Sequence, residues 1–429
     1  MKKLLGKILF ILAVGLFTAC SPLPDPAPSP RVRDNFDTNW RFHLGDLRNA
    51  EQPSFDDSSW RQLNLPHDWA IEGDFSADNP SGPGGGALPG GVGWYRKHFD
   101  IDSTLLSSGK RIYLDFDGVY MLSEVFVNGH STGIRPYGYI SFRRDITPYL
   151  QAGTNVVAVR VDNSKQPNSR WYSGCGIYRH VWMVTVAPIH VDLWGTYVTT
   201  PEINDSQATV NVATRLRNSL QEKAEVKVCQ YILDADGKTV AYADGFMTVP
   251  ADTTAESSLQ LTLKAPRRWS IDDPYLYTVH TQIIADGQTI DSYDSPLGIR
   301  TFRFDAEKGF FLNEKPVKIK GVCMHHDLGC LGAAVNERAI ERQLEMLKAM
   351  GCNAYRCSHN PPAPEVLDLC DRMGLIVMDE SFDMWRKRKT TYDYSRFFNE
   401  WYERDLTDLV MRDRNHPSIF IWSLGNEVL

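Results

Sequence analysis

The stretch LIVMDESFD, residues 375–383, decides the fold of this sequence. Its apolar start leads directly into Asp379 and Glu380. A short apolar run that ends in acids is typical of a buried strand with ionisable side chains at its carboxyl end. The run IFIWSLGNE, residues 419–427, has the same plan and ends in Asn-Glu. We therefore expect two buried strands whose last residues carry chemistry.

The segment around these two strands alternates between strand and helix patterns. Further strands are expected at VKIKGVCM (317–324) and NAYRC (353–357). Helices are expected at ERAIERQLEMLKAM (337–350), at EVLDLCDRM (365–373) and over 397–414, because apolar residues recur there at helical spacing. Such alternation predicts parallel strands joined by helical crossovers.

We interpret residues 305–429 as the first half of an α/β (β/α)₈ barrel, a TIM barrel. Such a barrel needs eight strands and roughly 250 residues, and this segment supplies four strand patterns. Because four strands cannot close a barrel, we expect the remaining strands to follow residue 429.

Two all-β domains are expected before the barrel. Residues 34–190 contain short alternating strands and the hairpin signal Asn128-Gly129, which favours a jelly-roll sandwich. Residues 191–304 contain strand patterns such as TVNVATRL and AEVKVCQYIL, separated by turn signals. This spacing is typical of an immunoglobulin-like β-sandwich.

The N-terminus has the pattern of a targeting segment. Basic residues precede an apolar stretch, residues 8–17, that is too short to span a bilayer comfortably. Cys20 and a Pro-rich run follow, which resembles a bacterial lipoprotein signal, with a plain secretory signal as the alternative. We predict a signal peptide over 1–20 and a tether over 21–33. The protein is then exported to the periplasm or outer membrane of a Gram-negative bacterium, and a lipid anchor is its only membrane contact.

Composition excludes several classes of function. The net charge of −7 leaves no basic surplus for nucleic acid. The sequence has no GxGxxG, Walker-type loop or HExxH, which argues against redox, phosphoryl-transfer and zinc-protease functions. Its GHSTG match around Ser131 lies in the hairpin signal and not on a strand-to-helix turn, which argues against a serine esterase. We predict no cofactor. Four cysteines in apolar stretches are expected to be buried: Cys323, Cys352, Cys357 and Cys370.

Polar residues gather after each strand of the expected half-barrel. They are His325, His326, Asp327, Arg356, His359, Asp379, Glu380, Asp383, Asn426 and Glu427. Active sites lie at the carboxyl ends of parallel strands, both in barrels and in open sheets. Carboxylates with His and Asn suit glycoside cleavage, in which one carboxyl protonates the leaving oxygen and a second attacks carbon or activates water.

Four motifs in this order resemble glycoside hydrolase family 2. They are GVCMHHDLG, NAYRCSHNPP, DESFDMW and WSLGNE, and the upstream loop SRWYSGCGIYRHVW is similar to that family as well. The resemblance covers nearly everything after Arg31. It implies a sugar-binding jelly roll, an immunoglobulin-like domain and a TIM barrel that performs retaining glycoside hydrolysis.

The resemblance also implies roles for individual residues. Glu427 matches the general acid/base, and Asn426 matches the residue that contacts the sugar 2-hydroxyl. Further expected substrate-binding residues are His325, His359, Arg356, His326, Asp327, Trp171 and Arg170. For Arg356 a purely structural salt bridge is the alternative, and Asp379 and Glu380 are expected to support the strand ends. Trp385 and Trp422 are either platforms or core.

In the family the nucleophile is a Glu on a later barrel strand. We therefore expect it after residue 429, and expect little activity from residues 1–429 alone. Some family members hold Mg²⁺ through an acid shortly after the Asp-Glu pair. Asp383 lies nearby here, but the pattern differs, so we predict no metal.

The HHDLG and DESFDMW versions look most like those of bacterial β-galactosidases. The expected substrate is therefore a terminal β-galactoside, as such or in an oligosaccharide. A β-glucuronidase or a β-mannosidase is the alternative within the family. A non-catalytic carbohydrate-binding lipoprotein is the alternative from another class. A homo-oligomer is left open.

Overall fold

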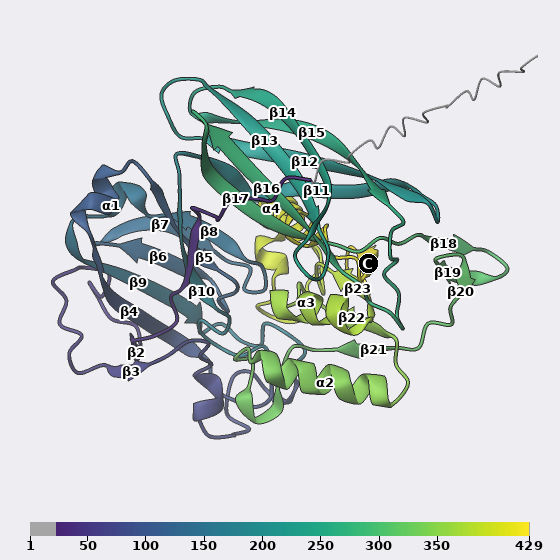
Figure 1. The fold of residues 1–429 in the computed structure, drawn as a ribbon. Helices are drawn as coiled ribbons and strands as arrows, with labels where there is room; N and C mark the ends of the chain where they lie inside the picture. Colours follow the sequence, from purple (N-terminus) through teal and green to yellow (C-terminus); the bar gives the residue numbers. More distant parts are fainter. Residues whose placement is uncertain (1–22, 429) are drawn as a thin grey trace, which may run out of the picture.

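A computed structural model describes residues 23–428 of the chain. It contains two β-sandwiches and a parallel sheet with helices (Figure 1). The jelly roll lies at the left of that view, the immunoglobulin-like sandwich at the top, and the parallel sheet below it. The predicted multidomain fold is confirmed. The predicted signal peptide and Cys20 lie outside the described residues.

The jelly roll packs a six-stranded sheet against a four-stranded one. The larger sheet has the order β3-β2-β4-β9-β6-β7: Arg61–Leu63, Trp40–Leu44, Gly91–Ile101, Gly153–Asn163, Ser123–Val127 and His130–Arg135. The smaller has the order β1-β10-β5-β8: Val32–Asn35, Val181–Val186, Arg111–Phe116 and Phe142–Asp145. Short helices are η1 (Ala70–Glu72), η2 (Pro83–Gly85), α1 (Ser103–Ser107) and η3 (Thr147–Tyr149). Asn128 and Gly129 join β6 to β7 with φ of 49° and 83°, the left-handed pair that a tight hairpin requires.

The immunoglobulin-like sandwich packs a three-stranded sheet against a four-stranded one. The first is β11-β12-β15: Ile189–Ile203, Gln207–Asn218 and Thr253–Lys264. The second is β14-β13-β16-β17: Thr239–Val249, Ala224–Leu233, Tyr277–Ala285 and Gln288–Leu297. Its core is made of alternating aliphatic residues such as Val210, Val212, Val279 and Leu261.

The last part begins with a small antiparallel sheet, β18 (Phe302–Asp305), β19 (Gly309–Leu312) and β20 (Lys315–Pro316). Parallel strands β21 (Gly321–Met324), β22 (Ala354–Cys357), β23 (Ile376–Glu380) and β24 (Ile419–Ser423) follow, in chain order across the sheet. The helices are η4 (Gly329–Leu331), α2 (Glu337–Ala349), α3 (Pro364–Met373) and α4 (Ser395–Asp413). The strand predicted over 317–324 is only half as long. At its start the Val317 N–H donates to the Phe310 carbonyl of β19, and the parallel strand β21 begins at Gly321.

Gly374 ends α3 in the left-handed region at φ 72°. A Cβ at this position would lie 2.2 Å from the carbonyl oxygen of Ile271 in the preceding sandwich. Only glycine permits both the backbone turn and this close approach. The turn into β23 is therefore fixed by a contact between two domains.

The two faces of the parallel sheet differ. Val322, Tyr355 and Val377 lie opposite one another in register and pack under α2 and α3. On the other face the register places Cys323 beside Arg356, which lies beside Met378. Cys323 is exposed there, so its expected burial is wrong. Cys352 is only half-buried, whereas Cys357 and Cys370 are buried.

Residues 23–33, predicted as a tether, are mostly exposed, but individual contacts join them to the immunoglobulin-like sandwich. The Arg31 guanidinium makes a bidentate ion pair with Asp291 at 2.8 and 2.9 Å, and Asp291 is fully buried. The Gln282 amide donates a hydrogen bond to the Ala27 carbonyl at 3.1 Å. A buried carboxylate needs a cationic partner, and this segment supplies it.

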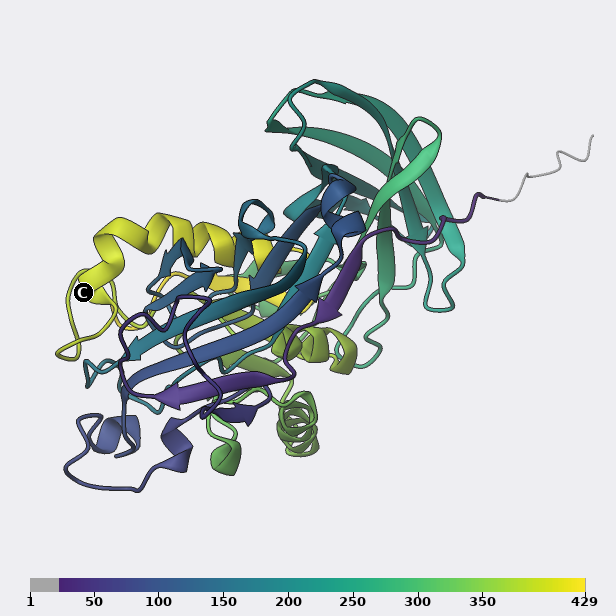
Figure 2. The ribbon, with the colours of Figure 1, turned by 90° about the vertical axis from the view of Figure 1, so that its left-hand side faces the viewer.

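Figure 2 shows α4 running beside the jelly roll. Arg135, fully buried on β7, pairs there with Asp405 and Asp408 of α4.

Within residues 23–428 no helix is both long and apolar enough to cross a membrane.

Candidate active site

Glu380 is the centre of the polar cluster at the carboxyl ends of the strands. Its buried carboxylate accepts hydrogen bonds from His359 Nδ1 at 2.6 Å, Ser423 Oγ at 2.6 Å, and Arg356 Nη2 and Nε at 2.8 and 3.1 Å. Burial acts to raise the pKa of Glu380, but these hydrogen bonds outweigh it and leave the pKa below its ordinary value. Glu380 is thus a buried anion that ties three strands together.

Asn426 joins this cluster to a second carboxylate. Its amide oxygen accepts from Arg356 Nη2 at 3.1 Å, and its amide nitrogen donates to Asp383 Oδ1 at 2.9 Å. Asp383 also accepts from Arg170 Nη2 at 2.6 Å and from Lys389 Nζ at 3.0 Å. Burial acts to raise the pKa of Asp383, but the hydrogen bonds from Arg170, Asn426 and Lys389 lower it overall. Both ends of the Asn426 amide are therefore fixed.

Glu427 lies at the rim of the cluster. Its side chain is 69% exposed, and Oε2 is 3.3 Å from Arg170 Nη1 and 3.8 Å from Lys389 Nζ. Lys389 also donates to the Asn426 carbonyl at 2.6 Å. The carboxylate expected to act as acid/base is thus solvent-accessible and lies beside two cations.

Trp171 brings the jelly roll into the site. Its ring stacks on His325, with centroids 4.7 Å apart and planes at 17°, and meets the His359 ring edge-on at 5.5 Å. His325 Nδ1 donates to the Ser358 carbonyl at 2.8 Å. Burial lowers the pKa of His325, which favours the neutral ring. Trp171 is buried, so it forms a wall for the two histidines rather than an open platform.

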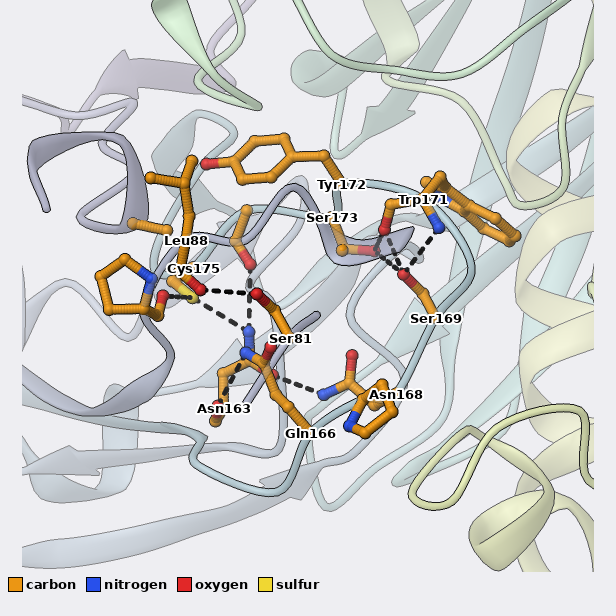
Figure 3. Close-up of a pocket in the computed structure, with 15 residues that line it drawn as sticks. Ser81, Leu88, Asn163, Gln166, Asn168, Ser169, Trp171, Tyr172, Ser173 and Cys175 are labelled. Atoms are coloured by element: carbon orange, nitrogen blue, oxygen red, sulfur yellow. Dashed lines mark hydrogen bonds between the residues drawn. The ribbon is translucent and has the colours of Figure 1, made fainter. Parts of the chain in front are cut away.

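The loop that carries Arg170 and Trp171 is held from below by a polar scaffold (Figure 3). The Asn163 amide donates to the Gly174 carbonyl at 3.1 Å, and the Asn168 amide donates to Asn163 Oδ1 at 2.6 Å. The pocket under this loop has a volume of about 20 Å³, room for about one water molecule. The hydrogen bonds of Asn163 and Asn168 hold the loop in place, and the pocket itself is too small for a sugar ring.

Two residues that the sequence did not suggest hold the loops of the site. Asp68, which is buried, accepts from Cys175 N and Ala333 N, both at 2.9 Å, and from the Tyr172 hydroxyl. It ties the Trp171 loop to the segment after β21. Burial raises the pKa of Asp68.

Arg179 is the second such residue, and it is fully buried. Its guanidinium donates to the carbonyls of Pro361 at 2.9 Å and Pro362 at 3.0 Å, just after His359. It also donates to the Tyr139 carbonyl at 2.8 Å. The jelly roll therefore grips the backbone of the loop that carries His359. No local signal could reveal this, since the partners are far apart in the sequence.

His326 and Asp327 lie apart from the cluster. His326 packs against the rings of Tyr139 and Tyr178 and donates from Nε2 to the Ser173 carbonyl at 3.2 Å. Burial lowers its pKa to about 3. Asp327 is half-buried, and its backbone carbonyl accepts from Gln343 on α2. The structure therefore places His326 at the domain interface and not in the group around Glu380.

The remaining candidates have different surroundings. Asp379 is fully buried, and burial and the neighbouring Asp413 raise its pKa well above the ordinary value. Trp385 is partly exposed and donates from Nε1 to the Leu424 carbonyl at 2.8 Å. Trp422 is partly exposed on β24. Between residues 23 and 428, no group of three or more His, Cys, Asp or Glu side chains is arranged to hold a metal ion.

Models of one protein family match the chain in three consecutive segments. The description "Glycosyl hydrolases family 2, sugar binding domain" matches residues 86–188, "Glycosyl hydrolases family 2" matches 189–300, and "Glycosyl hydrolases family 2, TIM barrel domain" matches 305–429. These segments correspond to the jelly roll, the second sandwich and the parallel sheet described above.

Individual relatives agree with this assignment. The chain is 62% identical over 402 residues to "Beta-galactosidase BoGH2A" of Bacteroides ovatus, which covers 94% of this chain and 47% of that protein. It is 44% identical over 398 residues to a "Putative beta-glucuronidase" of Formosa agariphila, with 92% and 37% covered. The chain thus spans about half the length of the curated relatives it matches, or less.

Solved structures show the same architecture. A glycosyl hydrolase family 2 member from Bacteroides cellulosilyticus superposes with a TM-score of 0.90 at 45% identity, covering 92% of this chain and 52% of that one. A β-glycosidase from Bacteroides vulgatus gives a TM-score of 0.88 at 41% identity, covering 92% and 50%. With matching segments, fold and domain order, the chain belongs to glycoside hydrolase family 2.

Proposed function

We propose that this chain forms the amino-terminal part of a retaining β-galactosidase. The observation that carries the proposal is the connected cluster from Glu380 through Arg356, Asn426 and Asp383 to Glu427. It lies where parallel α/β folds place their active sites. The 62% identity to a protein named β-galactosidase supports galactose as the sugar.

Glu427 is the proposed general acid/base. Its exposed carboxyl is free to turn toward a glycosidic oxygen, while Asn426 beside it is fixed. Asn426 uses one amide N–H and its oxygen on Asp383 and Arg356, so a second amide N–H remains for a sugar hydroxyl. His359 and His325, whose ring centroids are 5.5 Å apart, are proposed to line the sugar site, and Trp171 packs against both rings.

The second carboxylate of the double displacement is proposed to come from a barrel strand beyond those described. In retaining glycosidases the two carboxyl groups stand about 5–5.5 Å apart across the sugar. Glu380 and Asp383 are poor candidates, because both are engaged in three or more hydrogen bonds. A kinetic test therefore needs a chain as long as that of the relatives.

The test compares Glu427→Gln with the natural protein on aryl and alkyl β-galactosides. Loss of a general acid costs about 10²- to 10⁴-fold in kcat/KM where the leaving group needs a proton. A dinitrophenyl leaving group needs none, so its kcat/KM falls much less. Glu400→Gln, an exposed carboxylate on α4, is the matched control. Equal losses on every leaving group would contradict the acid/base assignment.

A β-glucuronidase is the second candidate, since several relatives bear that name. Turnover of one aryl leaving group on galactose and on glucuronic acid separates the two. A higher kcat/KM on the galactoside supports the proposal. A higher value on the glucuronide replaces it.

We also propose export with a lipid on Cys20. Cells grown with labelled palmitate then yield a labelled protein, and Cys20→Ser abolishes the label. If the natural protein stays unlabelled, lipidation of Cys20 is refuted and a plain secretory signal is the remaining interpretation of residues 1–20.

A further inference from the structure

A basic segment borders the proposed acid/base. Arg386, Lys387 and Arg388 follow one another and are all exposed. Within residues 23–428 none of the three side chains makes an ion pair or a hydrogen bond. Three free cations in a row are notable in a chain whose net charge is −7. Unpaired charge of one sign at the rim of a site attracts a ligand of the opposite sign.

The segment is held against the turn that carries Glu427. At one end Trp385 Nε1 donates to the Leu424 carbonyl at 2.8 Å. At the other end Lys389 Nζ donates to the Asn426 carbonyl at 2.6 Å. Because both anchors are on that turn, residues 386–388 are held close to it, and their side chains are exposed.

Trp385 adds a flat surface to this rim. Its side chain is 39% exposed, although its indole N–H is anchored and its ring stacks on Phe398 at 6.3 Å. A Cβ on Gly425 would lie 2.8 Å from Trp385 Nε1. The turn thus passes close against the indole. Exposed, anchored aromatic faces suit the C–H faces of sugars.

An acid/base carboxyl protonates the oxygen of the leaving group. The leaving sugar must therefore lie on the side of Glu427, where Trp385 and the three cations are. We infer that the leaving-group sugar is anionic, bearing a carboxylate or a sulfate ester, and that residues 386–388 bind its charge while Trp385 stacks on its ring. This inference rests on the proposed function and adds the substrate class on the leaving-group side.

The test uses matched disaccharides and a chain of the relatives' length. Galactose release is measured from a β-galactosyl disaccharide that ends in glucuronic acid and from the same disaccharide that ends in glucose. A third disaccharide ends in sulfated glucose. The quantity compared is the ratio of kcat/KM for each charged substrate to that for the neutral one. All three disaccharides share the galactosyl half, so an effect on the binding of galactose changes both kcat/KM values equally and leaves the ratio unchanged.

We expect a ratio of about ten for at least one charged substrate at low salt, as favourable charge pairing at a rim provides. Raising ionic strength from 0.01 to 1 M shortens the Debye length from about 30 to about 3 Å, so the ratio should fall toward one. The triple variant R386Q/K387Q/R388Q should lower it similarly. The control K315Q/K318Q/K320Q removes three exposed lysines before β21, at the opposite end of the sheet, and should leave the ratio unchanged.

The outcomes are distinguishable. An advantage for glucuronic acid alone, or for sulfate alone, identifies the anion and supports the inference. Galactose release at similar rates from all three disaccharides overturns the inference and leaves the proposed function standing. No release from any of them, nor from aryl galactosides, overturns the proposed function and the inference with it. The salt series needs no variant, so a folding defect in the triple variant does not weaken the test.

Discussion

Removing the charge of Glu380 should loosen the sheet that carries the site. Glu380→Gln keeps the shape of the side chain, but an amide N–H₂ then faces donors on His359, Ser423 or Arg356. Breaking a buried ion pair costs about 3–5 kcal/mol. The Arg356 side chain is 30% exposed and keeps some hydration, so we take the lower end, about 3 kcal/mol.

Hydrogen exchange measures this loss strand by strand. About 3 kcal/mol corresponds to a little over 100-fold in an opening equilibrium. Amides of β22, β23 and β24 should therefore exchange about 100-fold faster in the variant, whereas those of the immunoglobulin-like sandwich should not change.

Glu345→Gln on α2 is the matched control. Glu345 pairs with Arg338 at 3.0 Å, but both side chains are exposed, and such pairs contribute about 0–1 kcal/mol. If Glu380→Gln exchanges no faster than this control, the buried cluster does not hold the strands and the reasoning fails.

The same cluster predicts a dependence on pH. The pKa of Glu380 is lower in the folded state than its ordinary value of 4.5. Its stabilisation is therefore present above pH 4.5 and is lost as the pH falls through the folded pKa. Protection factors of the natural protein and of Glu380→Gln should converge below pH 4.5. A constant difference across the acid range would contradict this assignment.

Three further predictions concern other parts of the chain. His416 Nδ1 donates a hydrogen bond to Asp371 at 2.6 Å. Burial acts to lower the pKa of His416, but the carboxylate of Asp371 outweighs burial and raises this pKa to about 9. The stabilisation that His416→Gln removes, measured by urea unfolding, should be full below pH 6.5 and vanish as the pH rises toward 9. Arg31→Ala leaves the buried Asp291 unpaired and should cost about 3–5 kcal/mol, with new proteolytic cleavage near residues 23–35; unchanged cleavage would argue against the packed segment. Trp171→Ala should lower kcat/KM for galactosides about tenfold, the order of a lost aromatic stack, and an unchanged value would remove Trp171 from the site.

The fold was predictable where one pattern dominates. The apolar runs before Glu380 and Asn426 became β23 and β24, and the helix expected over 337–350 became α2 over 337–349. These elements have strong periodicity and clear ends. The grouping of Arg356, Glu380 and Asn426 at one edge of the sheet could be predicted, because a parallel sheet brings the carboxyl ends of its strands together.

What escaped sequence reasoning depends on long-range contacts. Exposure of Cys323 depends on which sheet face is covered, and the apolar run alone does not tell this. Arg31 looked like part of a tether because its partner Asp291 is 260 positions away. Asp68 and Arg179 act by gripping backbone groups of other domains, and no motif spacing records such contacts.

The grip of Arg170 and Arg179 on the barrel segment has an evolutionary consequence. The proposed catalytic carboxylate Glu427 and the jelly-roll residues beside it, Arg170 and Trp171, lie in separate regions of one chain. Substitutions in the loop around Arg170 can therefore change substrate preference while the carboxylates stay as they are. Recombination is constrained in the same way, because a transferred jelly roll that lacks these two arginines would leave Asp383 with Lys389 as its only cation and would remove the Arg179 contacts from the loop after His359. Relatives of this chain should diverge through paired changes across the domain boundary, and chimeras that fold correctly should need both partners from one parent.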